Sequence, residues 1–309
     1  MPEKLPQSQA QQFVRDRYGD RAGALTLVGA GEWSQAYAFT LDGRELVVRF
    51  GGYVADFRKD RLMAGYSSAG LPIPRVVELG EAPGGFFVVA QRAHGQFLDD
   101  LDAAGFRAAL PALLSALDSA RDIDVSGTTG YGGWQPDRTA PHQSWADTLL
   151  HGFQDQPGSR THGWRARLED SPTGAGPFDQ GLAAMRSLVR SCPDGRQIIH
   201  GDLLNRNVLV DGGRVSAVLD WGNSMYGDGL YDLAWLLFWQ PWYPAWHEVD
   251  LHGIIDEHLE ARPAAERAGL DERLRCYQVH IGLDSQTYNA FTGRWDNLAQ
   301  VTEQTLALL

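Results

Sequence analysis

Hydrophobic and polar positions alternate along the first hundred residues in short runs that are typical of β-strands. The strand-like runs are residues 32–40, 45–50, 75–79 and 86–91. Asp-Gly between the first two runs and Pro-Gly-Gly between the last two are turn signals. A helical stretch over residues 56–69 separates the two pairs. These patterns predict a small antiparallel sheet with a single helix.

From residue 97 onward, helical spacing replaces the alternation. Apolar residues recur three and four positions apart between Phe106 and Leu117, which is typical of one buried helix face. Pro111 is expected to kink this helix or to mark its start. Residues 197–220 again read as strands, and most of the remaining chain reads as helix. Two stretches rich in Gly, Pro and Ser are predicted to be long surface connections, residues 124–142 and 154–177.

Together these patterns predict an α+β fold with two lobes. A β-rich lobe is expected over residues 1–96 and a larger, mainly helical lobe over residues 97–309. The length of 309 residues suits two such bodies. A ligand is expected to bind where the two lobes meet.

Composition narrows the class of protein. A chain with 43% hydrophobic and 21% charged residues is globular rather than disordered. Two cysteines cannot build a disulfide framework or a zinc site, and they suit a cytoplasmic protein. A signal peptide is not expected, because the N-terminal residues MPEKLPQSQAQQF contain no long apolar stretch. A membrane span is not expected, because Asp232 and Pro241 interrupt the most apolar segment. The net charge of −12 disfavours nucleic acid and membrane partners and attracts cations. We expect a monomer.

Residues 208–210 and 215–219 form the clearest local signal. Both are short apolar runs, and Asp-Gly-Gly joins them. This arrangement predicts a β-hairpin in which Val210 lies opposite Val215.

Three oxygen-bearing side chains converge at the open end of this hairpin. In that register Asn207 lies opposite Val218, and Asp220 follows within about 7 Å of Asn207. Asp202 reaches the same end on the preceding loop. Two carboxylates and an amide suit Mg²⁺, and their order matches the proton-accepting Asp and the two metal ligands of protein kinases. The sequence therefore predicts Asp202 as catalytic, with Asn207 and Asp220 as metal ligands.

Three neighbouring polar residues are predicted to support this loop. His200 is expected to orient it through hydrogen bonds rather than to titrate in catalysis. Asp228 stands at a helix start and suits an N-cap. For Asp232, in an almost wholly apolar helix, a bond to the catalytic loop and an unrelated structural role are both open.

At these residues the chain resembles the aminoglycoside phosphotransferase family, which has a protein-kinase-like fold. The resemblance rests on HGDLLNRNVLV and VLDWGNSMYGDGLYDLAWL, and it extends over nearly the whole chain. GEWSQAYAF, GDGLYDLAWLLFWQPW and RCYQVHIGLD are similar to the hygromycin B branch. The resemblance implies Mg²⁺-dependent O-phosphorylation of a cationic aminoglycoside, with hygromycin B as the expected acceptor and antibiotic resistance as the consequence. ATP is the expected donor, and GTP stays open.

The resemblance also implies a nucleotide site in the β-rich lobe. A glycine-rich loop would cover the phosphates, Arg49 stands where a phosphate-binding Lys is usual, and a hinge segment would meet adenine through its backbone. The acidic partner of Arg49 is open, with Asp60 as the nearest candidate. The nucleotide-binding residues so predicted are Gly31, Ser34, Arg49, Gln91 and Ala93.

Substrate contacts are expected from the helical lobe. Apolar residues between Leu270 and Phe291 form one stripe that includes Asp284, which predicts a buried carboxylate. Such a group needs either an internal Arg or a ligand cation, and the resemblance favours the ligand. Aromatic faces suit sugars and ammonium groups. The substrate-binding residues so predicted are Asp202, Asn205, Trp239, Trp242, Asp284 and Tyr288.

Two other functions fit the same residues. The first is a kinase of another small-molecule hydroxyl, such as choline, homoserine, a macrolide or another metabolite, because the phosphate site does not fix the acceptor. The second is a nucleotide-binding sensor that transfers no phosphate. The intact set Asp202, Asn207 and Asp220 argues against the second.

Overall fold

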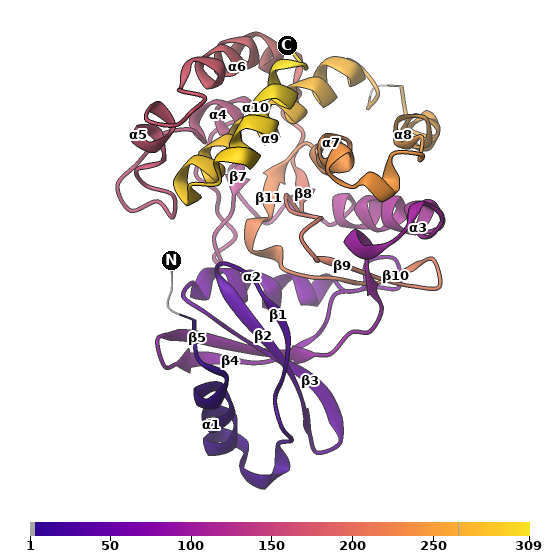
Figure 1. Ribbon diagram of the computed structural model, residues 1–309. Helices are drawn as coiled ribbons and strands as arrows, with labels where there is room; N and C mark the ends of the chain where they lie inside the picture. Colours follow the sequence, from indigo (N-terminus) through magenta and orange to yellow (C-terminus); the bar gives the residue numbers. More distant parts are fainter. Residues whose placement is uncertain (1–3, 265) are drawn as a thin grey trace. The chain divides into compact units, whose positions relative to one another are not determined.

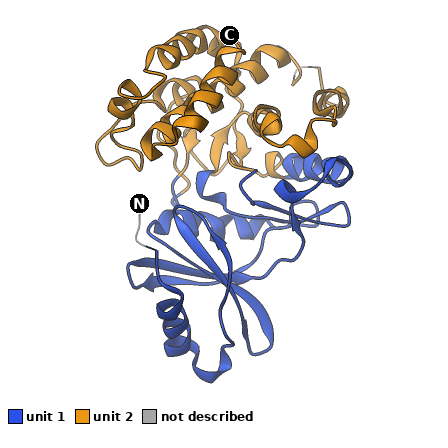
Figure 2. Ribbon diagram, in the orientation of Figure 1, with its two compact units in different colours: residues 1–119, 135–137, 204–223 blue, residues 120–134, 138–203, 224–309 orange. Residues whose placement is uncertain are grey.

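The computed structural model describes residues 4–264 and 266–309 and divides into two compact units (Figures 1 and 2). Unit 1 comprises residues up to 119, 135–137 and 204–223; unit 2 comprises residues 120–134, 138–203 and those from 224 onward. The lobe boundary predicted at residues 96 and 97 falls inside unit 1 and stays a prediction. No helix in the described ranges is both long and apolar enough to cross a membrane.

An antiparallel sheet forms the centre of unit 1, with the strand order β1-β2-β3-β5-β4. Its strands are β1 (Thr26–Ala30), β2 (Ser34–Leu41), β3 (Arg44–Gly51), β4 (Val76–Ala82) and β5 (Gly85–Gln91). The four predicted strands are confirmed, and the hairpin turn between β2 and β3 lies at Asp42–Gly43. Strand β1 was not predicted from the sequence.

The prediction of a single helix beside this sheet is wrong. Besides α2 (Val54–Met63), the structure contains α1 (Gln7–Tyr18), which the apolar pattern does not reveal because only Ala10 and Val14 of this helix are buried. The Phe13 ring of α1 meets the rings of Phe50 and Phe87 edge-on, at centroid distances of 5.4 and 5.0 Å. Helix α1 thereby covers one face of the sheet.

The predicted hairpin is present in unit 1, with a shifted register. Strands β9 (Val208–Asp211) and β10 (Arg214–Val218) pair with Val215 opposite Val210, as predicted. A bulge then places Val218 opposite Val208 rather than opposite Asn207. The extra residue of the bulge breaks the strict alternation that the prediction assumed. Strand β6 (Gln96–Phe97) adds to β9 and completes this small sheet.

Helix α3 (Ala103–Arg121) runs through Pro111 without ending there. Pro111 is exposed, so the carbonyl group left without its helical partner can be hydrated. Most of this helix belongs to unit 1.

Unit 2 is mainly helical. Its helices are α4 (Trp145–His151), α5 (Trp164–Glu169), α6 (Gly176–Leu188), α7 (Leu230–Trp239), α8 (Leu251–Glu260), α9 (Leu270–Thr292) and α10 (Trp295–Leu306). Its strands β7 (Gly132–Gly133), β11 (Met225–Gly227) and β8 (Gln197–Ile199) form a small antiparallel sheet in that order. Helix α5 lies within the stretch predicted as a connection at residues 154–177, so that prediction is wrong there.

Short 3-10 turns complete the chain and mostly end or join longer elements. They are η1 (Gly19–Arg21), η2 (Ala64–Tyr66), η3 (Leu98–Asp100), η4 (Val189–Ser191), η5 (Trp221–Asn223), η6 (Gln240–Trp242) and η7 (Pro244–Trp246).

Helix α9 is the central helix of unit 2, in contact with α5, α6, α7 and α10 (Figure 1). Close packing requires Gly282 on this helix. A Cβ atom there would lie 2.1 Å from Oγ1 of Thr305 on α10 and 3.1 Å from the Phe238 ring on α7. Thr305 is 1% exposed and donates a hydrogen bond to the carbonyl of Val301 at 2.6 Å, so its side chain has little room to move.

We therefore expect Gly282→Ala to destabilise the protein by about 1–3 kcal/mol through overpacking. Alanine in an ordinary helix position would instead stabilise it by up to about 1 kcal/mol. Gly176→Ala on α6 is the matched control, because no atom lies within 4 Å of its added Cβ. Urea unfolding measures both variants. A Gly282→Ala protein as stable as the wild type would contradict the close packing of α7, α9 and α10.

Candidate active site

The loop that carries Asp202 follows strand β8 in unit 2, and Asp232 of α7 holds it. The Asp232 carboxylate accepts hydrogen bonds from the backbone N–H groups of His200 at 2.8 Å and Gly201 at 2.9 Å. Gly201 has a φ of +73°, which glycine adopts without strain. Of the two roles left open for Asp232, the bond to the loop is the one present.

Burial raises the pKa of Asp232 to about 6, while the two backbone hydrogen bonds act in the opposite direction. The carboxylate is therefore largely ionised at neutral pH, the state that accepts both N–H bonds. The loop that carries Asp202 is thus tied to the first turn of α7 by a buried charge-assisted contact.

His200 lies almost fully buried beside this loop. Its Nδ1 atom accepts a hydrogen bond from the backbone N–H of Asp202 at 3.2 Å. Accepting at Nδ1 fixes the neutral ring with its proton on Nε2. This contact is the orienting role that the sequence predicts for His200.

In unit 1 the open end of the hairpin brings Asn207 close to Asp220. The backbone N–H of Leu219 donates to the carbonyl of Asn207 at 2.7 Å, so Asp220 follows directly after the residue paired with Asn207. The bulge in β10 therefore leaves Asp220 one residue beyond that pair instead of the predicted two. Asn207 is buried and Asp220 is partly exposed, with a φ of +57°. An amide and a carboxylate are donors that fit Mg²⁺.

Arg49 on β3 connects this hairpin end to helix α2. Its Nη1 atom bonds Oδ2 of Asp60 at 2.9 Å, and its Nη2 atom bonds Oδ2 of Asp220, also at 2.9 Å. Asp60 is thus the acidic partner that the sequence left open. Its second oxygen accepts from the backbone N–H of Trp221 at 2.8 Å. The neighbouring Lys59 donates instead to the carbonyl of Gly222, at 2.8 Å.

Burial and the neighbouring opposite charges act in opposite directions on the pKa values of Asp60 and Arg49. Burial raises the pKa of Asp60 to about 6, because it outweighs the lowering by Arg49, and the negative charge of Asp220 raises it further. Burial alone would lower the pKa of Arg49, but Asp220 and Asp60 keep it above its usual range. Arg49 is therefore always charged, and it faces two carboxylates at once.

The glycine-rich loop of unit 1 joins β1 to β2. The N–H of Gly31 donates to the carbonyl of Ser34 at 3.0 Å and closes the turn. A Cβ on Gly51 of β3 would lie 2.9 Å from the carbonyl oxygen of Trp33, so the loop requires glycine beneath it. Gln91 ends β5 and Ala93 follows it. Ser34, Arg49 and Gln91 lie on one sheet, with Gly31 and Ala93 in the loops next to it, and the predicted nucleotide roles of these residues stay predictions.

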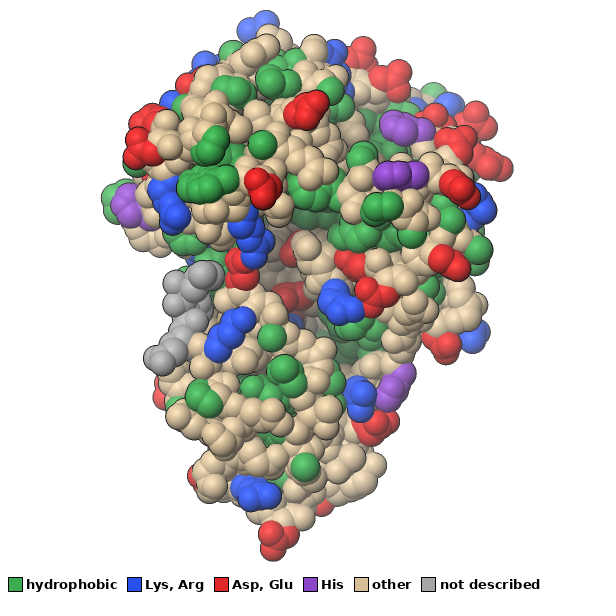
Figure 3. Space-filling model, in the orientation of Figure 1, with side chains coloured by type: hydrophobic (Ala, Val, Ile, Leu, Met, Phe, Trp, Pro, Cys, Tyr) green, Lys and Arg blue, Asp and Glu red, His purple; other side chains and the backbone are tan. Residues whose placement is uncertain are grey.

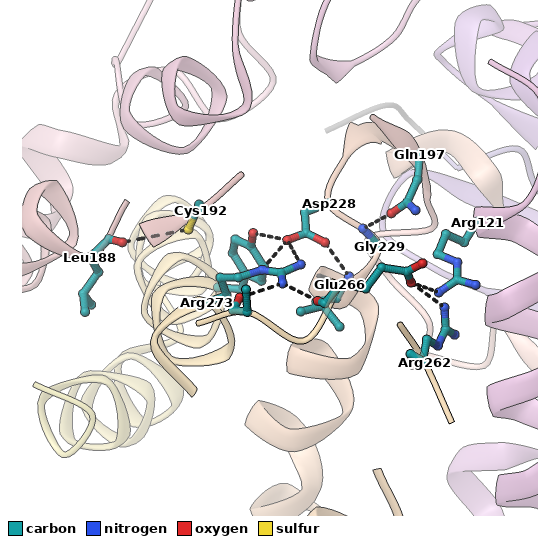
Figure 4. Close-up of polar contacts among 12 residues, drawn as sticks. Arg121, Leu188, Cys192, Gln197, Asp228, Gly229, Arg262, Glu266 and Arg273 are labelled. Atoms are coloured by element: carbon teal, nitrogen blue, oxygen red, sulfur yellow. Dashed lines mark hydrogen bonds and ion pairs between the residues drawn. The ribbon is translucent and has the colours of Figure 1, made fainter. Parts of the chain in front are cut away.

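A buried charged network at Asp228 links β11 and α7 to α9 (Figure 4). The Asp228 Oδ2 atom accepts bonds from Nη2 of Arg273 at 2.6 Å and from the hydroxyl of Tyr277 at 2.5 Å. Its Oδ1 atom accepts from the backbone N–H of Leu230 at 3.2 Å, but the N-cap of α7 is Gly229, so the predicted N-cap role of Asp228 is wrong. Arg273 and Asp228 are 5% and 4% exposed. The sequence missed Arg273 and Tyr277 as partners of Asp228, because no local pattern links them.

The predicted substrate residues of unit 2 form two separate groups. The Trp239 and Trp242 rings meet at 5.3 Å, and Trp242 Nε1 donates to Gln304 Oε1 at 2.8 Å. Asp284 and Tyr288 lie one turn apart on α9. Within the described ranges, no hydrogen bond or ring contact joins the tryptophans to Asp284 or Tyr288.

The prediction that Asp284 is buried is wrong. More than a third of this residue is exposed. Buried residues occur all round α9, so its apolar stripe does not show which positions are covered. Surrounding protein nevertheless raises the pKa of Asp284 to about 6. Among the described residues, its carboxylate has neither a hydrogen bond nor an ion pair. It is thus a crowded carboxylate that is open to solvent and ionised at neutral pH.

Asp202 belongs to unit 2, whereas Asn205, Asn207, Asp220 and Arg49 belong to unit 1. The two sets are continuous in sequence, since residues 202–207 connect them. Within residues 4–264 and 266–309, no group of three or more His, Cys, Asp or Glu side chains could hold a metal ion.

Comparisons with known proteins point to phosphoryl transfer. A family model described as "Phosphotransferase enzyme family" matches residues 24–272. Hygromycin-B 4-O-kinase of Escherichia coli is 30% identical over 298 residues, which cover 96% of this chain and 83% of that protein.

Solved structures of aminoglycoside phosphotransferases are similar to this chain in fold. The ternary complex of a thermostable mutant of aminoglycoside phosphotransferase APH(4)-Ia with AMP-PNP and hygromycin B has a TM-score of 0.82 and 28% identity, over 97% of each chain. The GDP and kanamycin complex of APH(2")-IIia, at 16% identity and a TM-score of 0.63 over 97% of each chain, shows the fold alone. These likenesses confirm the α+β, protein-kinase-like fold.

The Asp228 network yields a stability prediction. Asp228→Asn should lower the free energy of unfolding by about 3–5 kcal/mol, because it leaves the buried Arg273 guanidinium without its anion. Asp122→Asn is the control: it also removes a carboxylate from an arginine, but its ion pair with Arg121 is exposed and should contribute below about 1 kcal/mol. Urea unfolding at neutral pH measures both. Equal losses in the two variants would contradict the role assigned to burial.

Proposed function

Because the chain belongs to the phosphotransferase enzyme family, we propose that it transfers the γ-phosphoryl group of ATP to a hydroxyl group of hygromycin B. The observation that carries this proposal is the order and spacing of Asp202, Asn207 and Asp220, with Arg49 bonded to Asp220. The relative from Escherichia coli supports the acceptor, and its name makes the 4-hydroxyl the first position to test. Resistance to the antibiotic would follow from its phosphorylation.

Each predicted site residue has its own role in the proposed transfer. Asp202 accepts or orients the proton of the acceptor hydroxyl, and the contacts of His200 and Asp232 hold its loop. Gly31 and Ser34 place the phosphate-covering loop, and Gln91 and Ala93 offer backbone groups to the adenine or guanine ring. The donor class, a purine nucleoside triphosphate, is supported by the AMP-PNP complex of APH(4)-Ia.

Asn207 and Asp220 would hold Mg²⁺, with phosphate oxygens and water completing its ligands. Bound there, the ion would neutralise the charge of the transferring phosphoryl group. Arg49 binds phosphate through its planar fork, and Asp60 keeps the guanidinium in place whether or not Asp220 remains paired with it.

Charge supports a cationic acceptor. Exposed acidic residues gather around α8, in the part of unit 2 where Figure 3 shows several red side chains together. They are Glu248, Asp250, Asp256, Glu257 and Glu260. With a net charge of −12, the protein attracts a polyamine sugar at low ionic strength. The cytoplasmic location and the monomeric state stay predictions.

A coupled ADP-release assay with ATP and Mg²⁺ tests the function directly. We expect turnover with hygromycin B and none with kanamycin, choline or homoserine. Asp202→Asn should lower turnover by roughly 10²–10⁴ while nucleotide binding changes little, because the proton acceptor is lost. Turnover with choline or homoserine instead would assign another acceptor, and near-normal turnover of Asp202→Asn would remove Asp202 from catalysis.

Asp284 tests the acceptor site. Asp284→Asn should lower kcat/KM for hygromycin B about 10-fold through lost pairing with a substrate ammonium group, with KM for ATP unchanged. Asp256→Asn on α8 is the control, because it removes an equal charge from the surface. Raised salt should weaken wild-type binding more than that of Asp284→Asn. If the two variants behave alike, Asp284 acts only through the overall charge.

A further inference from the structure

Asp99 makes a long-range contact that no sequence pattern predicts. Its Oδ1 atom accepts a hydrogen bond from the backbone N–H of Asn205 at 2.8 Å, and its Oδ2 atom accepts from the N–H of Arg206 at 3.1 Å. One carboxylate therefore binds two successive peptide groups across 106 residues of sequence. All three residues belong to unit 1.

The two peptide groups belong to strained residues. Asn205 and Arg206 both have a φ of 66°, the left-handed region that non-glycine residues avoid. They lie between the predicted proton acceptor Asp202 and the predicted metal ligand Asn207. Such a conformation persists where surrounding groups enforce it. Rotation about the backbone bonds of Asn205 would turn the two N–H groups away from each other and break a bond to Asp99. Arg206 then has to span the short path from this clamp to β9, which restricts its own conformation.

Asp99 itself is firmly attached to the hairpin that it acts on. Strand β6, just before it, pairs Gln96 with Val210 and Phe97 with Leu209 of β9. Leu98 is fully buried. Asp99 and the segment it binds are thus parts of the same small sheet, so the carboxylate can fix the path of the chain into β9.

We propose that Asp99 is a positioning residue for phosphoryl transfer: it holds Asn205 and Arg206 left-handed and thereby sets where Asn207 stands. This inference rests on the proposed function. Asn207 comes directly after the clamped pair, and its carbonyl bonds Leu219 beside Asp220. Without the clamp, rotation at residues 205 and 206 changes the spacing from Asp202 to Asn207. Misplacement of about 1 Å at a reacting centre costs up to about 100-fold in rate.

The chain supplies a matched control next to Asp99. Asp100 forms an ion pair with the Arg206 guanidinium, which also stacks over the Phe97 ring at 4.6 Å. Both charged partners are about half exposed, so this pair contributes little. Asp100 holds the side chain of Arg206, whereas Asp99 holds its backbone.

The test compares Asp99→Ala, Asp99→Asn and Asp100→Ala. We expect Asp99→Ala to lower kcat about 10-fold or more and to raise the Mg²⁺ concentration needed for half-maximal binding of AMP-PNP, measured by calorimetry. Asp99→Asn keeps one acceptor oxygen and should recover part of both effects. Asp100→Ala should match the wild type. Melting temperatures identify losses that come from unfolding alone.

A double-mutant cycle with Arg206→Gly tests the backbone argument. Glycine adopts the left-handed conformation without strain, so Asp99→Ala should cost less kcat in the Arg206→Gly background than in the wild type. Equal costs in both backgrounds would overturn the proposal. So would wild-type kcat and Mg²⁺ dependence in Asp99→Ala, or equal losses in Asp99→Ala and Asp100→Ala.

The outcome for Asp99 is separable from that of the proposed function. If the wild type phosphorylates no acceptor, the proposed function fails. Mg²⁺-dependent binding of AMP-PNP, compared among the wild type, Asp99→Asn and Asp100→Ala, still decides whether Asp99 positions Asn207. A shift in Asp99→Asn alone supports the proposal, and no shift overturns it.

Discussion

Arg49 joins the separate elements of unit 1. It stands on β3, in the middle of the sheet, and its guanidinium bonds Asp60 on α2 and Asp220 after β10. A mostly buried guanidinium that lost these anions would destabilise the fold by several kcal/mol, so α2 and the hairpin must both present a carboxylate at this point. A lysine could not satisfy the arrangement as well, because its single ammonium group lacks the planar fork that reaches two carboxylates at once. The position of Asp220 is therefore a consequence of how the sheet, the helix and the hairpin pack.

The same cluster carries more negative than positive charge close to Arg49. Two carboxylates share one guanidinium, and the raised pKa of Asp60 reflects that crowding together with burial. A divalent cation at Asn207 and Asp220 would relieve the repulsion between the carboxylates, while a phosphate group would find Arg49 already charged and held. The electrostatic strain of the cluster without ligands thus favours binding of a cation and an anion together, which is what a metal–nucleotide complex supplies.

Sequence patterns predicted those parts of the structure that depend on near neighbours. Asp-Gly and Asp-Gly-Gly turns identified both hairpins, and alternation identified four strands of the sheet. The pattern failed where long-range packing decides. Helix α1 presents only Ala10 and Val14 as buried residues, too few for a visible stripe. The β10 bulge shifted the register opposite Asn207. Buried residues lie on all sides of α9, so its apolar stripe did not reveal that Asp284 is exposed.

In the candidate site, too, sequence patterns predict some residues and miss those that depend on long-range contacts. A proton acceptor or metal ligand must be of a given residue type, so type and spacing are enough to predict Asp202, Asn207 and Asp220 for these roles, which stay predictions. A positioning residue is defined by what it touches, and the partners of Asp232, Asp228 and Asp99 lie 32, 45 and 106 residues away. The segment FLDDLD shows why type alone cannot find them. Asp99 binds the backbone of residues 205 and 206, Asp100 binds the Arg206 side chain, and Asp102 accepts from the N–H of Gly105 at the start of α3. Three aspartates within four positions thus have three different tasks, and the pairing of β6 with β9, which residue type does not reveal, brings Asp99 to residues 205 and 206.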